Sequence, residues 1–418
     1  MDLVTVKLIL VLSKRWNVPA RHGDVPNAYV KAEKEEHLDI FMKVPKGIQI
    51  TKEELQGFGV ESPGEVALLL KKSLYGLKQA GRLWSKLLHS KLTENGYKQC
   101  TTDMCLYYKH QGQEWTIVGV YVDELLVTGT KQCAVDEFFA GMETLSIKDL
   151  GVVQKFLGLR ISLDETQGYI LDQEVMIDVL LRDFWLESAN GVRTPIGDDC
   201  NDDNKDDVDY LPAKGASGEP SLSAFQSLVG SLLWIARCTR PDICFAVHKA
   251  TRQTHKPTTK DWKIAKRIAR YLKATKNLRL HLNGNGPTQQ NKQSGVSLST
   301  MEAEFISSSQ AGRELLGVRE LLLELKLQVC IPMPMWMDNQ AAIKQLEGEK
   351  STTSAKHVDI RFKFICHYAR EGIVVPKYVK TESMMADILT KSLPAPRMEE
   401  LRKMFNLRTI QAEVEEEC

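Results

Sequence analysis

Two β-rich apolar runs that flank a pair of adjacent acids constrain the fold most strongly. They form the stretch TIVGVYVDELLVTG at residues 116–129, with Asp123 and Glu124 between the runs. Such runs predict two antiparallel strands, with the acids at the hairpin turn between them. A rigidly held turn of this kind suits two-metal phosphoryl transfer, in which carboxylates hold Mg²⁺ ions a few ångströms apart. Acids at hairpin turns also occur without any function, so both interpretations stay open for this feature alone.

Length and composition limit the number of domains, the way in which nucleic acid could be bound and the kinds of site that the chain could hold. A chain of 418 residues is long enough for about two or three domains. Lys and Arg total 55 against 54 Asp and Glu, so any nucleic-acid binding must come from local patches. The nine cysteines lack CxxC pairs, which favours reduced thiols in an intracellular compartment and argues against a structural zinc site. The apolar run from Leu3 to Leu12 predicts a buried helix, with no targeting signal and no membrane segment.

The pattern changes along the chain in a way that predicts separate domains. To about residue 170, helical and β-rich patterns alternate, which predicts an α+β domain. Residues 198–209, DDCNDDNKDDVD, predict a solvated linker because they offer almost nothing apolar to bury. From Phe225 to Leu282 the pattern is helical, and Lys249–Arg279 within it is rich in Lys and Arg. That stretch is the best local candidate for a phosphate-backbone surface, with a merely solvated helix face as the alternative.

Beyond a polar, turn-rich loop at residues 283–295, mixed helices and strands without repeats predict a second α/β domain. Helices are expected over Met301–Leu327, Gln340–Leu346, Ile360–Arg370 and Met384–Leu389, the last being the final helix, and strands over Pro334–Asp338 and Ile373–Val379.

A third acid, Asp24, lies upstream in GDVPNAYVKA at residues 23–32. This segment, LKKSLYGLKQAGRLW at 70–84, DMCLYYK at 103–109, the hairpin at 116–129 and KDLGVVQKFLGLRI at 148–161 follow one another along the chain. Together they resemble the reverse transcriptase of copia-type retrotransposons in the family's own order. The resemblance covers essentially the whole chain and implies an α+β fold, with a polymerase palm of antiparallel sheet and helices.

The resemblance also implies a division of the chain. The palm and the start of the thumb would occupy residues 1–196, and the acidic linker residues 197–220. Residues 221–284, with LVGSLLWIARCTRPDICFAV, resemble the helical thumb or connection segment, whose basic face would carry the hybrid. Residues 285–418 resemble a partial RNase H-like α/β domain.

Residue by residue, the resemblance makes Asp24 and Asp123 the palm carboxylates on the catalytic metals, with Glu124 standing where the family usually has Asp. The implied cofactor is Mg²⁺, with Mn²⁺ as the alternative. Tyr29 falls at the position that excludes a ribose 2′-hydroxyl, an ordinary buried aromatic being the alternative. The stretch that lines the nucleotide and template side of the pocket corresponds to Tyr75, Gly76, Leu77, Lys78 and Gln79.

Residues 156–159, FLGL, resemble the turn that grips the primer end, although an apolar hairpin would look the same. Two departures predict weakened polymerisation. Glu124 adds a methylene to a carboxylate whose reach sets metal geometry, and Mg²⁺ tolerates little departure from octahedral coordination. Met1 stands immediately before the helix that precedes Asp24, so the fingers, which help to position the nucleotide, are expected to be mostly missing.

Near the C-terminus, LSTMEAEFISS at 298–308, MWMDNQAAI at 335–343, KHVDIRF at 356–362 and MADILTKSL at 385–393 resemble the family's RNase H domain. Glu304, Asp338 and Asp387 map onto three of its usual acids, with Glu302 as the alternative to Glu304. The fourth acid, expected soon after Leu282, is missing, so the first strands of that sheet are expected to be deleted and RNase H activity lost. His357 would neighbour the site, a helix-face pair with Asp359 or Arg361 being the alternative.

The resemblance therefore implies an RNA-directed DNA polymerase region with weakened two-metal nucleotidyl transfer. Its partners would be an RNA template, a DNA primer, deoxynucleoside triphosphates and an RNA–DNA hybrid. Two alternatives stay open: an inactive retrotransposon remnant, and a nucleic-acid-binding module without catalysis. The sequence contains no aspartic-protease, zinc-knuckle or integrase motif.

Overall fold

The computed structural model describes residues 1–197, 209–216, 219–283, 300–347 and 359–409. The chain divides into two compact units, Met1–Val153 and Gln154–Cys418. Each unit is described below by itself. The acidic stretch 198–209, predicted to be a linker, lies almost entirely outside the described residues. The predicted domain bounds at residues 196, 220 and 284 stay predictions.

A six-stranded antiparallel sheet forms the centre of the N-terminal unit. Its strand order is β4-β5-β6-β7-β1-β8. The strands are β4 (Lys98–Gln99), β5 (Leu106–Gln111), β6 (Glu114–Tyr121), β7 (Glu124–Gly129), β1 (Arg21–Asp24) and β8 (Lys148–Val152). The hairpin predicted over residues 116–129 is confirmed, because β6 pairs with β7 from Thr116–Gly129 to Tyr121–Glu124. β1 comes from a distant part of the chain and is inserted between β7 and β8.

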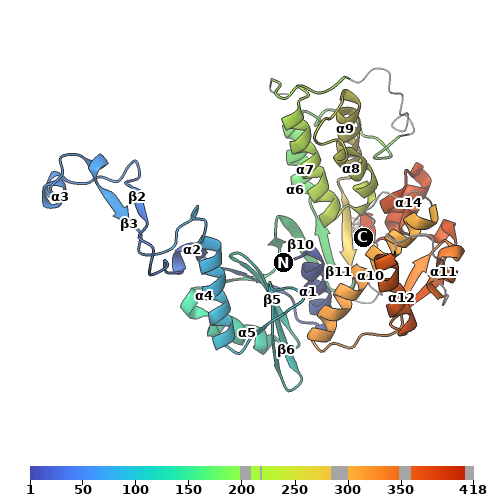
Figure 1. Ribbon diagram of the computed structural model, residues 1–418, viewed down its shortest axis with the longest axis horizontal. Helices are drawn as coiled ribbons and strands as arrows, with labels where there is room; N and C mark the ends of the chain where they lie inside the picture. Colours follow the sequence, from blue (N-terminus) through green and yellow to red (C-terminus); the bar gives the residue numbers. More distant parts are fainter. Residues whose placement is uncertain (198–208, 217–218, 284–299, 348–358, 410–418) are drawn as a thin grey trace, which may run out of the picture. The chain divides into compact units, whose positions relative to one another are not determined.

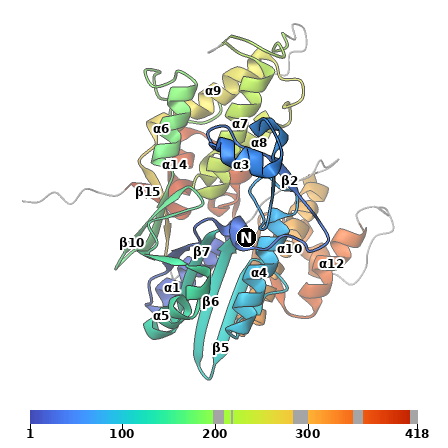
Figure 2. The ribbon, with the colours of Figure 1, turned by 90° about the vertical axis from the view of Figure 1, so that its left-hand side faces the viewer.

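Helices cover both faces of this sheet. On one face, Leu125 and Val127 pack into a core with Trp84 of α4 (Ala80–Glu94) and Phe138 of α5 (Gln132–Gly141). α4 lies along β5 and β6 (Figure 2). On the other face, Gly119 allows α1 (Leu3–Trp16) to approach, since a Cβ there would lie 2.6 Å from Ile9 Cδ1. Successive strand residues point to opposite faces, so this packing fixes which residues of β7 face each helix.

The predicted buried helix at the N-terminus is confirmed as α1. Asp2 caps it by accepting a hydrogen bond from the Val4 N–H, and Asn17 ends it in the left-handed conformation with φ 55°. The N-terminal unit also contains α2 (Ala28–Lys31), α3 (Lys52–Phe58), and the short antiparallel pair of β2 (Phe41–Lys43) and β3 (Ala67–Leu69). Among the described residues, no helix has the length and apolar character needed to cross a membrane.

A second antiparallel sheet, with strand order β15-β12-β11-β10-β9, lies in the C-terminal unit. Its strands are β9 (Lys155–Phe156), β10 (Leu159–Asp164), β11 (Gly168–Asp172), β12 (Leu278–Leu282) and β15 (Leu407–Thr409). The prediction of helix up to Leu282 is therefore wrong at its end. The run LRLHL alternates with a period of two, and Leu280 pairs with both Leu171 and Leu407.

A helical bundle packs beside this second sheet (Figure 1). It contains α6 (Glu174–Asp183), α7 (Leu222–Cys238), α8 (Cys244–Thr251) and α9 (Thr259–Ala274). α9 begins with a capping box in which Thr258 and Asp261 exchange hydrogen bonds. Ala265, Ile268, Ala269 and Leu272 share the buried face of α9 and join one core with α6, α7 and α8.

The last part of the C-terminal unit is a smaller α/β arrangement. It contains α10 (Thr300–Glu324), β13 (Met333–Met337), α11 (Gln340–Glu347), α12 (Asp359–Arg370) and β14 (Val374–Tyr378). These elements confirm the predicted helices and strands. β13 and β14 form a parallel pair, and no further strand joins them among the described residues. The prediction that Met384–Leu389 holds the final helix is wrong, because α14 (Ala395–Met404) and β15 follow α13 (Asp387–Thr390).

Candidate active site

Two acids from neighbouring strands lie directly opposite each other at one end of the first sheet. Asp24 ends β1, Glu124 begins β7, and the two are paired in the antiparallel register. Opposed residues in such a pair have Cβ atoms about 4.5–5.5 Å apart, and like charges at that spacing destabilise a sheet. A bound cation would remove this penalty.

The third predicted acid, Asp123, lies in the two-residue turn between β6 and β7. Val122 occupies the first turn position with φ 56°, which is uncommon for a β-branched residue. Two hydrogen bonds hold the turn: the Trp84 Nε1–H donates to the Val122 carbonyl at 2.6 Å, and the Val25 N–H donates to the Asp123 carbonyl at 2.9 Å. The second bond fastens the end of β1, and with it Asp24, to the turn.

The three acids are chemically suitable ligands for a hard cation, but their side chains do not form a closed cluster. Carboxylate oxygens are the ligands that Mg²⁺ prefers. Among the described residues, however, no three His, Cys, Asp or Glu side chains are grouped closely enough to hold a metal ion. Asp24, Asp123 and Glu124 are therefore brought together along the backbone, while their side chains do not converge on one point.

A histidine that sequence reasoning missed lies beside this group of acids. His22 Nε2 is 3.7 Å from Glu124 Oε1, with 12% of the His22 side chain and 30% of the Glu124 side chain exposed. His22 stands two positions before Asp24 on β1, so both side chains point to the same face as Glu124. The H-x-D spacing at a strand end is the signal that could have found it.

Two tyrosines predicted to lie near the nucleotide contact each other. The rings of Tyr29, on α2, and Tyr75 have centroids 4.6 Å apart and are inclined by 46°. Tyr75 is 49% exposed. Gly76 follows with φ 93°, a conformation that favours glycine whatever the surrounding space. Lys78 is exposed, and Gln79 is the N-cap residue of α4.

The segment FLGL forms a tight hairpin between β9 and β10. Phe156 and Leu159 are paired across the turn, and both are fully buried. Leu157 and Gly158 make the turn with φ 51° and 77°, the two positive values of a type I′ turn. The type I′ turn and the burial of Phe156 and Leu159 are enough to explain the shape of this hairpin. The resemblance to a primer grip therefore stays a prediction.

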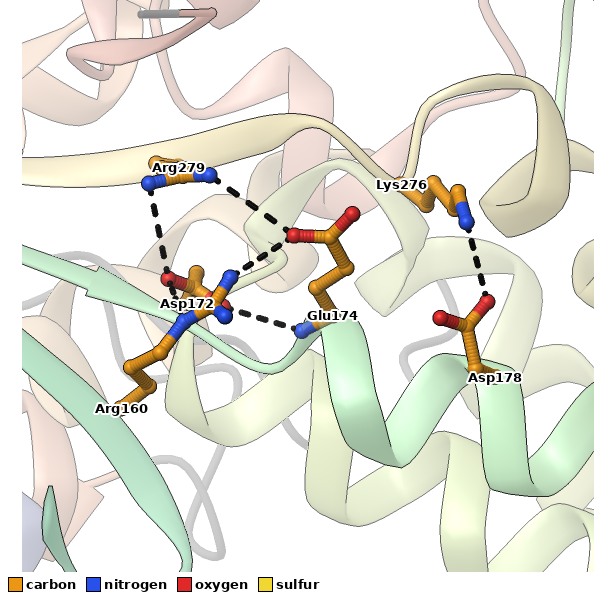
Figure 3. A network of polar contacts seen from close by, with 6 residues as sticks. All are labelled: Arg160, Asp172, Glu174, Asp178, Lys276 and Arg279. Atoms are coloured by element: carbon orange, nitrogen blue, oxygen red, sulfur yellow. Dashed lines mark hydrogen bonds and ion pairs between the residues drawn. The ribbon is translucent and has the colours of Figure 1, made fainter.

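An ion-pair network fastens this hairpin to the beginning of α6 (Figure 3). Arg160 Nε donates to both oxygens of Asp172 at 3.0 and 2.8 Å, and its Nη2 donates to Glu174 Oε2 at 2.7 Å. Arg279 of β12 lies within 4.0 Å of Asp172 and 3.7 Å of Glu174. Only 2% of the Asp172 side chain is exposed, so the network joins three strands and a helix around one buried carboxylate.

The basic stretch 249–279 separates into two parts. Its later cations make contacts inside the C-terminal unit: Arg270 donates to the Asn190 carbonyl, Lys273 to the Glu187 and Ala189 carbonyls, and Lys276 pairs with Asp178. In the earlier part, Arg252, Lys256 and Lys263 are exposed. The prediction that the whole stretch offers one phosphate-binding surface is therefore too broad, because the later side chains hold α9 against residues 178–190.

The predicted RNase H site stays a prediction, because the structure describes the side chains of only two of its acids, Asp338 and Asp387. Asp338 follows β13 and is half-buried. Asp387 begins α13, which packs against α8; it is 7% exposed and pairs with Lys391 at 2.7 Å. The side chains of Glu304 and Glu302 lie outside the described part of the chain, as does His357.

Comparison with known proteins gives the following matches. Residues 1–198 match a protein-family model described as reverse transcriptase (RNA-dependent DNA polymerase). The retrovirus-related Pol polyprotein from transposon TNT 1-94 of Nicotiana tabacum is 27% identical, over 97% of this chain and 32% of its own length. That from transposon RE1 of Arabidopsis thaliana is also 27% identical, over 93% of this chain and 27% of its own length. The chain thus spans a third or less of these relatives.

Among solved structures, the chain is similar to the foamy viral protease-reverse transcriptase in complex with an RNA/DNA hybrid. The TM-score is 0.43 and the identity 12%, over 90% of this chain and 45% of that chain.

Proposed function

We propose that residues 1–198, which match a reverse transcriptase family model, form a weakened RNA-directed DNA polymerase site. The whole chain is similar over nearly its full length to retrotransposon Pol polyproteins. The observation that carries this proposal is the pairing of Asp24 with Glu124 beside a turn that contains Asp123. Strand pairing and two hydrogen bonds to the turn place all three acids at one end of a rigid sheet.

Asp24 and Asp123 would hold Mg²⁺ or Mn²⁺, with Glu124 as the third carboxylate. Such ions, when bound, activate a primer 3′-hydroxyl and stabilise charge on the phosphates of an incoming nucleotide. The chain's own contribution is to fix the carboxylates on the ends of paired strands, where the backbone leaves them little freedom. Tyr29, against Tyr75, would lie under the sugar of the nucleotide.

The altered carboxylate at position 124 accounts for the weakened polymerisation that we propose. Glu124 is longer than the Asp of the family by one methylene, and its carboxylate lies near His22. Mg²⁺ demands near-octahedral geometry, so a displaced ligand reduces its occupancy at the site. We also propose that RNase H activity is lost. Among the described residues, β13 pairs with β14 alone, so this small sheet does little to position the remaining acids.

Primer extension on an RNA template with a DNA primer, in Mg²⁺ and then Mn²⁺, tests the polymerase proposal. We expect slow extension that Asp123→Asn abolishes and that Glu124→Asp accelerates. Lys86→Gln, at an exposed position of α4, serves as a matched control and should leave extension unchanged. Extension that survives Asp123→Asn, or that is absent from both the parent chain and Glu124→Asp, would refute the proposal.

A second candidate function is nucleic-acid binding without synthesis. The observation that favours it is the exposure of Arg252, Lys256 and Lys263 on and beside α8 and α9. Salt-dependent binding of an RNA–DNA hybrid, unaffected by Asp123→Asn and accompanied by no extension, would support this candidate over the first.

A further inference from the structure

His22 offers the carboxylate of Glu124 an alternative to a metal ion. The imidazole Nε2 and the carboxylate Oε1 are 3.7 Å apart, which is ion-pair distance for a protonated imidazole. Both groups are largely enclosed, so their attraction is screened less than that of a surface pair. When an oxygen of the Glu124 carboxylate points to this imidazole, it points along β1 and away from Asp24, which lies at the end of that strand.

The strand register explains why the length of Glu124 matters. Its Cα is paired with that of Asp24, and His22 is paired with Leu126, so His22 is a diagonal neighbour of Glu124 rather than its direct partner. Diagonal neighbours on one face are about 7–8 Å apart between their Cα atoms, a span that long side chains bridge. An Asp at this position is about 1.5 Å shorter and would keep its carboxylate above Asp24.

We propose that His22 holds the Glu124 carboxylate off the metal position, so that His22 and a divalent cation compete for the same ligand. This inference rests on the proposed polymerase site and explains why the described acids are not closed into a cluster. His22 is a positioning residue here, because it acts through Glu124. Releasing Glu124 from His22 should therefore tighten cation binding, whereas an ordinary supporting neighbour of a metal ligand would weaken it when removed.

Mn²⁺ binding to the full chain, measured by the loss of the free-ion signal in electron paramagnetic resonance, tests this competition without requiring synthesis. Six chains are compared: the parent, His22→Gln, Glu124→Asp, the double variant of these two, Asp123→Asn and the control His37→Gln. We expect His22→Gln and Glu124→Asp each to lower the apparent Kd about fivefold, which corresponds to about 1 kcal/mol. The double variant should bind no more tightly than Glu124→Asp alone, because the shorter carboxylate cannot reach residue 22.

Each contrary result has a distinct meaning. If His22→Gln weakens Mn²⁺ binding or leaves it unchanged, the competition is refuted while the polymerase site stands. If Asp123→Asn leaves the Mn²⁺ signal intact, the ion is bound elsewhere and the proposed site itself is refuted. His37→Gln, at an exposed loop position, is the matched control and should bind as the parent does. Fully additive effects in the double variant would also overturn the competition, since they would show that His22 acts independently of Glu124.

Discussion

Replacing Asp242 by Ala should destabilise the helical bundle of the C-terminal unit more than any surface change. Asp242 and Arg240 form a bidentate ion pair at 3.0 and 2.8 Å, with 0% and 1% of their side chains exposed. The Tyr271 hydroxyl also donates to Asp242 at 2.6 Å. Without the carboxylate, Arg240 retains the backbone carbonyl and hydroxyl of Thr275 at 3.0 and 2.6 Å, which leaves a buried charge uncompensated.

The expected loss is about 3–5 kcal/mol, the cost of removing one partner from a buried pair. Replacing both residues together, as Arg240→Met with Asp242→Leu, should cost much less, because no charge then remains in the core. Glu400→Ala removes an ion pair with Arg397 in the same unit, but that carboxylate is 59% exposed, so its loss should stay within about 0.5 kcal/mol.

Hydrogen–deuterium exchange of peptides from α7, α8 and α9 measures this effect where it is expected, and peptides from β6 and β7 in the other unit provide an internal reference. A chain with two units does not unfold in one step, so a global unfolding midpoint alone would be ambiguous. A loss below about 1 kcal/mol for Asp242→Ala, or a double variant as unstable as the sum of the single variants, would refute the reasoning.

The ion pair of Asp242 and Arg240 also makes the stability of the helical bundle depend on pH. Burial raises the pKa of Asp242, but Arg240 and Tyr271 more than offset this, so that the pKa in the folded protein lies below the ordinary 3.8. The stability that the pair contributes is therefore present above the pKa of the unfolded chain and is lost as the pH falls through the lower folded-state pKa. Exchange protection of α9 should be constant near neutral pH and should fall only in acid.

Three further changes test other contacts. Trp84→Phe removes the hydrogen bond to Val122 and should cost about 1 kcal/mol, seen as faster exchange in β6 and β7; an unchanged rate would show that the bond does not hold the turn. Arg160→Ala should cost about 1–3 kcal/mol and loosen β10 and β11, because both oxygens of the enclosed Asp172 lose the N–H of Arg160 Nε, whereas Arg193→Ala, with a side chain 78% exposed, should change nothing. Arg252→Gln and Lys263→Gln should each lower the salt-dependence slope of hybrid binding, measured by fluorescence anisotropy, by about one unit; an equal effect from Arg270→Gln would contradict the division of the basic stretch.

Elements encoded by local patterns could be predicted from the sequence. The hairpin at residues 116–129 combines strand-forming residues with a turn, and α1 combines a capping residue with an apolar run. In each case, the residues that decide the structure are neighbours in the chain. The prediction that Asp24 lies near Asp123 and Glu124 came from the resemblance of the motifs to a known family. No local pattern in the sequence indicates it.

The parts that could not be predicted depend on partners far away in the chain. β12 was predicted as the end of a helical run, because its pairing with β11 and β15 involves residues more than a hundred positions away on either side. Arg270 and Lys273 looked like free cations, because the carbonyls that they bind belong to residues 187–190. The H-x-D spacing could point to His22, but its approach to Glu124 follows only from the register of β1 against β7.

The two groups of acids differ in the strands that support them. Asp24 lies on a strand paired on both sides, with Glu124 of β7 opposite it on one side and Lys148 of β8 on the other. The backbone at such a position cannot shift without breaking hydrogen bonds to both neighbouring strands. Asp338 follows β13, whose described partner is β14 alone, and Asp387 packs with α8 instead. Paired strands therefore fix the backbone positions of Asp24 and Glu124 in the N-terminal unit, whereas in the described part of the C-terminal unit Asp338 follows a strand with one neighbour.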